Sequence, residues 1–110
     1  MQMIYLSHPY TGDEENNLNR AEELAAKLTV DYPGIVFVNP LNAMRHMKKT
    51  NLPYEQVVGQ CVELMKRCDA VIMAEGWQKS VGCCMEHQNA QAAKMKIYDG
   101  VAQWQEKSVK

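Results

Sequence analysis

The residues best suited to carry chemistry lie in the segment that begins at Ser80. Ser is a residue type that caps helices, and Gly82 allows a ligand to approach the backbone of the first helical turn. Glu86 follows four residues later, one turn further along the same face of the predicted helix. The free N–H groups at such a helix start favour an anion, such as a phosphate or a carboxylate. This spacing selects Glu86 from the thirteen acidic residues as the candidate catalytic carboxylate.

A purely structural role is the alternative interpretation for these residues. A Glu in the second turn of a helix is commonly a solvated side chain favoured by the helix dipole. Tyr5 lies inside a short apolar run, and an aromatic residue in a buried strand is usually a core residue with its hydroxyl bonded to the backbone. Spacing alone leaves both interpretations open.

The elements that must position these residues begin with four short apolar runs. The runs predict buried strands over Met3–Ser7, Ile35–Val38, Ala70–Met73 and Met95–Tyr98. They are continuous rather than alternating, which is typical of parallel strands covered on both faces. We therefore expect a parallel sheet with helices on each side.

Helical patterns lie between the predicted strands. Over Asp13–Val30, apolar residues recur on one face at Leu18, Ala21, Leu24, Ala25 and Leu28. A second helix opens at Pro53 and carries a stripe of Val57, Val58, Cys61, Leu64, Met65 and Cys68. A third begins after Ser80 and carries Val81, Cys84, Met85 and Ala92, and a short extra helix is predicted over Pro40–Lys49 with Asn39 as its cap.

Alternating strands and helices predict an α/β fold. We expect one domain over residues 1–110, with an open, doubly wound, flavodoxin/Rossmann-like parallel sheet of about four strands in the order 2-1-3-4. The tail Val101–Lys110 stays unassigned, with Trp104 docking on the body or on a partner.

In such sheets a ligand binds at the carboxyl ends of the strands, where the strand order reverses. Here that point lies between the first and third strands. The first strand leads into the loop of Ser7, His8, Pro9, Tyr10, Thr11 and Gly12, and the third leads into Ala74–Ser80. Because both loops feed helix starts, we expect the ligand site where Ser7–Gly12 meets Ser80–Glu86.

Composition excludes several classes of protein. A net charge of −1 and a pI of about 6.3 argue against a protein that grips polymeric nucleic acid, so we expect no such partner. No window approaches the about 18 apolar residues that a membrane span needs, and no export signal is visible. Together with four cysteines that suit reduced thiols, this predicts a cytoplasmic protein without membrane contact.

The cysteines are also the basis of a less favoured hypothesis, a thiol or metal site. Its members would be Cys61, Cys68, Cys83, Cys84 and His87. The chain holds no Cys-x-x-Cys pair, and small core or surface residues are the simpler interpretation of these thiols. We therefore expect no metal and no cofactor.

The motifs, taken in order, resemble the nucleoside 2-deoxyribosyltransferase-like superfamily, and more narrowly its small, largely uncharacterised phage and bacterial members. The resemblance covers about residues 3–98 and is carried by Ile4–Gly12, Asn16–Arg20, Cys68–Ile72, Gly76–Gly82 and Glu86. It implies cleavage of an N-glycosidic bond of a nucleoside or nucleotide, with transfer of the sugar to a base or to water.

The resemblance also implies roles for individual residues. Glu86 matches the nucleophile that attacks the anomeric carbon, and Tyr5 matches the Tyr that positions it. Ser80 and Gly82 match the turn that contacts the sugar or its 5′-phosphate. Tyr10 or Trp77 would stack on the base, although Trp77 is equally suited to an exposed loop or an interface. The resemblance further implies a homodimer or higher homo-oligomer, for which Trp104, Met44 and Met47 are candidate contacts.

Two positions depart from the pattern of the family. Cys61 stands where active members have an Asp that helps to hold the base and its proton, and a thiol in an apolar stripe has a raised pKa. His8 stands where the family usually has Gly, and it is a tolerated loop residue, a phosphate contact or a substitute acid–base group. The alternative function is therefore a non-catalytic nucleotide- or nucleoside-binding module.

Overall fold

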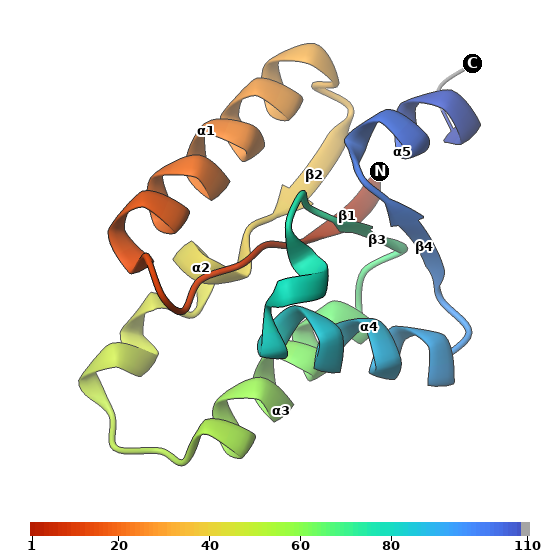
Figure 1. The fold of residues 1–110 in the computed structure, drawn as a ribbon. Helices are drawn as coiled ribbons and strands as arrows, with labels where there is room; N and C mark the ends of the chain where they lie inside the picture. Colours follow the sequence, from red (N-terminus) through yellow and green to blue (C-terminus); the bar gives the residue numbers. More distant parts are fainter. Residues whose placement is uncertain (109–110) are drawn as a thin grey trace.

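A four-stranded parallel sheet forms the centre of the computed structural model, which describes residues 1–108 (Figure 1). The strands are β1 (Gln2–Ser7), β2 (Ile35–Val38), β3 (Ala70–Met73) and β4 (Lys96–Asp99). Their order is β2-β1-β3-β4, and every neighbouring pair is parallel. This confirms the predicted α/β class, the strand order and the Rossmann-like architecture. Two strand bounds shift slightly from those predicted, since β1 begins at Gln2 and β4 covers Lys96–Asp99.

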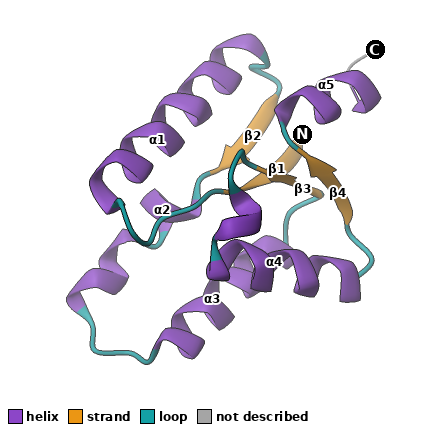
Figure 2. Cartoon of the chain, viewed as in Figure 1, coloured by secondary structure: helices purple, strands orange, loops and turns teal. Residues whose placement is uncertain are grey.

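Helices cover both faces of the sheet (Figure 2). One face packs against α1 (Glu14–Asp31) and α5 (Val101–Ser108), and its core includes Ile4, Leu6, Leu28, Ile72 and Trp104. The other face packs against α3 (Tyr54–Lys66) and α4 (Val81–Ala92), and its core includes Tyr5, Val58, Val62, Met65 and Val71. Strand side chains alternate between faces, so Tyr5 and Ser7 of β1 share the α3–α4 side.

The stripe predicted for α1 is confirmed. That of α4 is wrong at its two ends, although Met85 packs against the core and Cys84 is half-buried. Val81 is 69% exposed and Ala92 is also exposed. The buried side chains of α4 are Cys83, Glu86 and Ala90. The error has a physical cause, because a carboxylate occupies the centre of the face that packs on the sheet, and apolar periodicity assigns that face to solvent.

The predicted helix over Pro40–Lys49 is divided in two. The α-helix α2 (Pro40–Ala43) is capped by the Asn39 side chain, which accepts from Leu41 N at 3.2 Å. Met44 then leads into the 3₁₀ helix η1 (Arg45–Lys49). A second 3₁₀ helix, η2 (Trp77–Lys79), precedes Ser80.

Residues 101–108 of the unassigned tail form α5, while 109–110 lie outside the described residues. Trp104 is only 1% exposed and docks on the body, with its ring edge-on to Tyr32 at 4.9 Å and to Phe37 at 5.6 Å between centroids. Its proposed use as an exposed contact between subunits is therefore wrong. Within residues 1–108, no helix is long and apolar enough to cross a membrane.

Candidate active site

The Glu86 carboxylate lies at the centre of the site and is held by two hydroxyl groups of β1. Tyr5 donates a hydrogen bond to Oε2 of Glu86, and Ser7 donates to Oε1 at 2.7 Å. Tyr5 and Ser7 are fully buried, and Glu86 is 8% exposed. The two donors lie two residues apart on one strand, so the strand period itself aims both hydroxyls at α4. The carboxylate is fixed in one orientation.

Burial and hydrogen bonding have opposite effects on the pKa of Glu86. Burial dominates and raises the pKa of the carboxyl group above its usual range, while the hydrogen bonds from Tyr5 and Ser7 lower it. Burial and the neighbouring carboxylate raise the pKa of Tyr5 far above its usual value, so its hydroxyl stays protonated as a donor. The site thus keeps a weakly hydrated carboxylate supported by neutral donors.

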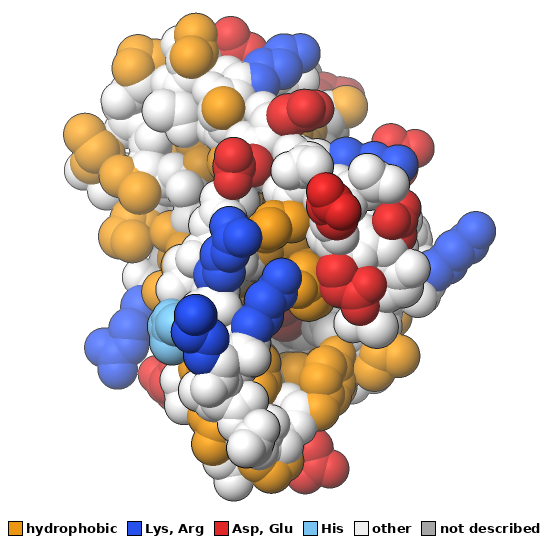
Figure 3. All heavy atoms as spheres, turned by 90° about the vertical axis from the view of Figure 1, so that its left-hand side faces the viewer, with side chains coloured by type: hydrophobic (Ala, Val, Ile, Leu, Met, Phe, Trp, Pro, Cys, Tyr) orange, Lys and Arg blue, Asp and Glu red, His pale blue; other side chains and the backbone are white. Residues whose placement is uncertain are grey.

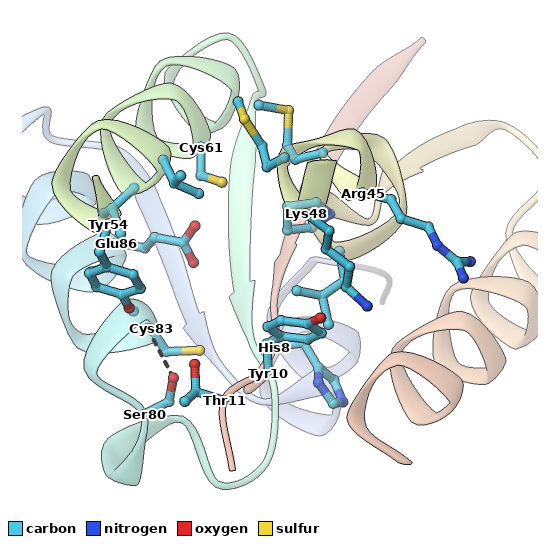
Figure 4. Close-up of a pocket in the computed structure, with 17 residues that line it drawn as sticks. His8, Tyr10, Thr11, Arg45, Lys48, Tyr54, Cys61, Ser80, Cys83 and Glu86 are labelled. Carbon is cyan, nitrogen blue, oxygen red and sulfur yellow. Dashed lines mark hydrogen bonds between the residues drawn. The ribbon is translucent and has the colours of Figure 1, made fainter. Parts of the chain in front are cut away.

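Glu86 opens on a hollow of about 780 Å³, its open mouth included, between the first loop, η1, α3 and the start of α4 (Figure 4). Loop and helix-start residues line one part, namely His8, Tyr10, Thr11, Ser80, Gly82, Cys83 and Glu86. The α2–η1 segment and α3 supply the rest, namely Pro40, Leu41, Met44, Arg45, Met47, Lys48, Tyr54, Val57, Val58 and Cys61.

The structure therefore brings together most of the residues predicted for the site. Tyr5 and Ser7 lie behind Glu86 rather than on the surface of the hollow, so Ser7 orients the carboxylate. Ser80 caps α4, its Oγ accepting from Cys83 N at 3.2 Å. Gly12 is exposed at a φ of +104° and lines neither of the two hollows described here.

Trp77 and Pro9 lie apart from the Glu86 hollow. Both line a second, open hollow beside α1 and β4, which His8 also borders. The Trp77 ring stacks on His87 with centroids 4.4 Å apart, and its Nε1 donates to Asp99 at 2.9 Å. These contacts hold the indole away from Glu86, which leaves Tyr10 as the predicted stacking residue inside the hollow.

Tyr54 is a site residue that the sequence reasoning missed. It is 51% exposed, lines the hollow, and its hydroxyl oxygen lies 3.0 Å from the position that a Cβ on Gly82 would occupy. Burial and the charge of Glu86 raise the pKa of the Tyr54 hydroxyl, which marks its closeness to the carboxylate. Its place directly after Pro53, at a predicted helix start, was the available signal.

Lysine and arginine at the mouth were also missed. Lys48 and Arg45 of η1 line the hollow, and Lys48 Nζ lies 5.2 Å from the centroid of the Tyr10 ring. Figure 3 shows Lys and Arg side chains gathered beside hydrophobic ones on the face that carries η1. In Figure 4 the Arg45 side chain points away from Glu86, so Lys48 is the residue that places a positive charge beside the first loop.

Cys61 lines the hollow close to Glu86 and Tyr5. Burial and the charge of Glu86 raise the pKa of the Cys61 thiol to about 11. At neutral pH the thiol is protonated and does not act as a proton acceptor.

Among residues 1–108, no group of three or more His, Cys, Asp or Glu side chains is arranged to hold a metal ion. The four cysteines, all within that range, are free thiols.

Comparison with protein families matches residues 2–99, most of the chain, to the family described as Domain of unknown function (DUF4406). No curated protein matches the chain.

Proposed function

Because the chain belongs to the DUF4406 family, whose description assigns no activity, we propose from the geometry of the site that it cleaves an N-glycosidic bond. The substrate is a deoxynucleoside or a deoxynucleoside 5′-monophosphate, and Glu86 is the nucleophile. The observation that carries the proposal is the Glu86 carboxylate, buried and fixed by Tyr5 and Ser7 at the wall of a hollow. The sequence resemblance to the nucleoside 2-deoxyribosyltransferase-like superfamily supports the same chemistry.

The reaction takes two displacement steps. In the first, a Glu86 oxygen bonds to the anomeric carbon while the carbon–nitrogen bond breaks, its electron pair leaving with the base, which takes a proton from solvent. In the second, water or another base attacks the same carbon, loses a proton, and the ester electron pair returns to the carboxylate. Splitting the reaction in this way replaces one difficult step by two easier ones. A fixed negative charge also stabilises the oxocarbenium-like transition states of both steps.

Tyr5 and Ser7 make this carboxylate suitable for the task. Each donates to a different oxygen, which holds the side chain in a reactive orientation without a counter-charge that would neutralise it. Burial leaves the carboxylate poorly hydrated, so less solvent must be displaced when it attacks. These residues are positioning groups for Glu86.

The groups around the mouth support a phosphorylated substrate. Ser80 and the start of α4 present helix N–H groups, and Lys48, which lies over Tyr10, adds a positive charge to the lining of the hollow. A 5′-phosphate is the anion that would meet both. No metal or cofactor is needed for any step.

The second candidate function is binding without catalysis. It is favoured by one observation, the neutral Cys61 thiol at the place where the superfamily has a base-handling Asp. A chain that holds a nucleotide but does not help the base to leave would act as a binding module. The two functions share the same hollow and differ in turnover.

The deciding experiment incubates the protein with a panel of deoxynucleosides and their 5′-monophosphates, with and without an acceptor base, and measures free base and exchanged product. Glu86→Gln tests the nucleophile, and Glu106→Gln, at an exposed position on α5, is its matched control. We expect turnover by the wild type and by Glu106→Gln, and loss of turnover in Glu86→Gln.

Tight binding without turnover, measured by calorimetry, would favour the binding module. In that case Cys61→Asp is the informative variant, since it restores a carboxylate beside the base. Full activity in Glu86→Gln would end the proposed mechanism.

A further inference from the structure

The part of the hollow that lies across Glu86 from Ser80 and the start of α4 is lined mainly by apolar side chains. We propose that this part, here called the apolar section, recognises the departing base through an apolar substituent, so that 5-alkyl pyrimidines are preferred to unsubstituted ones. The inference rests on the proposed function and names the substrate class for the same site. The apolar section consists of Leu41, Met44, Met47, Val57 and Val58.

Three elements build the apolar section. Leu41 belongs to α2 and Met47 to η1, while Val57 and Val58 belong to the first turns of α3. Methionine side chains are flexible and polarizable, so they fit flat groups of different outline. An apolar lining of this kind suits a planar ring better than a sugar with several hydroxyl groups.

The side chains on the two sides of Glu86 in Figure 4 suggest how a substrate would be oriented in the hollow. Ser80 and Thr11 lie together on one side of the Glu86 carboxylate, and Cys61 of α3 lies on the other. The sugar and its phosphate match the polar side with its helix start. With the anomeric carbon at Glu86, the base must then extend past Cys61 into the apolar section.

The apolar section offers few groups that read the polar edge of a base. Of the residues described as lining the hollow, none is Asn, Gln or Asp, and Glu86 is engaged by two hydroxyls. The Cys61 thiol is a weak donor and is neutral. Lys48 sits over the Tyr10 ring. Within the apolar section, discrimination therefore comes from apolar contact.

A methyl group at the pyrimidine 5-position is the apolar edge that a common base presents. Burying one such carbon group contributes about a fourfold preference, and more where the fit is close. Purines carry polar atoms around most of their edge, so the apolar section would leave those atoms without partners.

The test compares thymidine with deoxyuridine, and likewise the two 5′-monophosphates, which differ by one methyl group. Release of free base gives the ratio of kcat/KM, and calorimetry gives the ratio of Kd. We expect thymine compounds to be preferred by about fourfold or more in both measurements. A ratio of one between the thymine and uracil compounds in both measurements, or a preference for the uracil compounds, would overturn the inference.

Met47→Gln adds a polar group to the apolar section at similar size, and Met3→Gln is the control on an exposed residue outside the hollow. We expect Met47→Gln to reduce the preference toward equality and Met3→Gln to leave it unchanged. An unchanged preference in Met47→Gln would refute the assigned apolar section.

The two proposals fail differently. A thymine preference in Kd without any turnover contradicts the glycosidic function and retains the apolar recognition. Turnover without a thymine preference retains the glycosidic function and contradicts the apolar recognition. Absence of both binding and turnover for every compound overturns both.

Discussion

Replacing Glu86 by Gln removes a negative charge from a buried position while keeping the shape of the side chain. Its amide oxygen still accepts from one of the two β1 hydroxyls, and its N–H₂ donates to the oxygen of the other. The main change in folding energy is therefore the loss of a buried charge. We expect Glu86→Gln to be more stable than the wild type at neutral pH.

The sign follows from proton binding. The folded-state pKa of Glu86 is raised by burial, so the folded protein binds this proton more tightly than the unfolded chain, whose Glu has a pKa of about 4.3. The stabilisation from the protonated form is complete below that unfolded value and is lost as the pH rises through the folded pKa. The advantage of Glu86→Gln must grow over the same interval.

Each unit by which the pKa is raised corresponds to about 1.4 kcal/mol. Because burial raises the pKa of Glu86, we expect a higher free energy of unfolding and a higher Tm for Glu86→Gln than for the wild type at neutral pH. Near pH ~4.3 the difference should approach zero. The assay is urea unfolding of both proteins across this range, followed by circular dichroism.

The refuting result is a Glu86→Gln variant that is less stable than the wild type at neutral pH. It would mean that the hydrogen bonds from Tyr5 and Ser7 outweigh the cost of burial. The carboxylate would then stabilise the packing of α4 on β1, rather than lower the stability of the protein in favour of function.

Three further outcomes are expected. Tyr5→Phe removes one donor, so turnover should fall about tenfold and the acidic limb of the pH–rate profile should move to higher pH, because this hydrogen bond lowers the pKa of Glu86. Gly82→Ala places a Cβ 3.0 Å from the hydroxyl of the half-exposed Tyr54, whose side chain can move, so the free energy of unfolding should change by less than about 1 kcal/mol. The Kd for a deoxynucleotide should rise, and an unchanged Kd would exclude Tyr54 from the site. Trp104→Ala should lower the free energy of unfolding by about 3 kcal/mol or more, since the buried indole fills the space under α5; a loss below about 1 kcal/mol would contradict that packing role.

The sheet was predictable because its signal is local. The run Ala70–Met73 is apolar throughout and buried throughout, as a strand covered on both faces requires. The equally apolar run Ile35–Val38 forms a strand at the edge of the sheet and is only partly buried, with Val36 43% exposed, so the prediction of a buried strand was wrong there. The strand order places the carboxyl ends of β1 and β3 side by side, so the position of the hollow followed from topology. That reasoning led to His8, Tyr10, Ser80 and Glu86 together.

Other parts of the site depend on contacts between distant segments. Lys48 and Met47 reach the hollow because α2 ends before Met44 and η1 then passes beside the first loop. Apolar periodicity does not predict where such a helix ends or which loop the next segment contacts. Trp77 is turned away by His87 on α4 and Asp99 on β4, which lie outside the loop where its role was predicted.

The pairing of Ser7 with Glu86 has the same origin. A serine at a strand end suits a ligand as well as a buried carboxylate, and only the packing of α4 on β1 decides between them.

The measurement closest to the central hypothesis is the mass of the protein after rapid acid quenching during turnover of a deoxynucleoside 5′-monophosphate, with the modified peptide identified. The proposed displacement requires a deoxyribosyl 5-phosphate ester on Glu86 in the wild type and none in Glu86→Gln. Release of free base with the ester on another residue, or undiminished release by Glu86→Gln, would contradict the role of Glu86 as nucleophile.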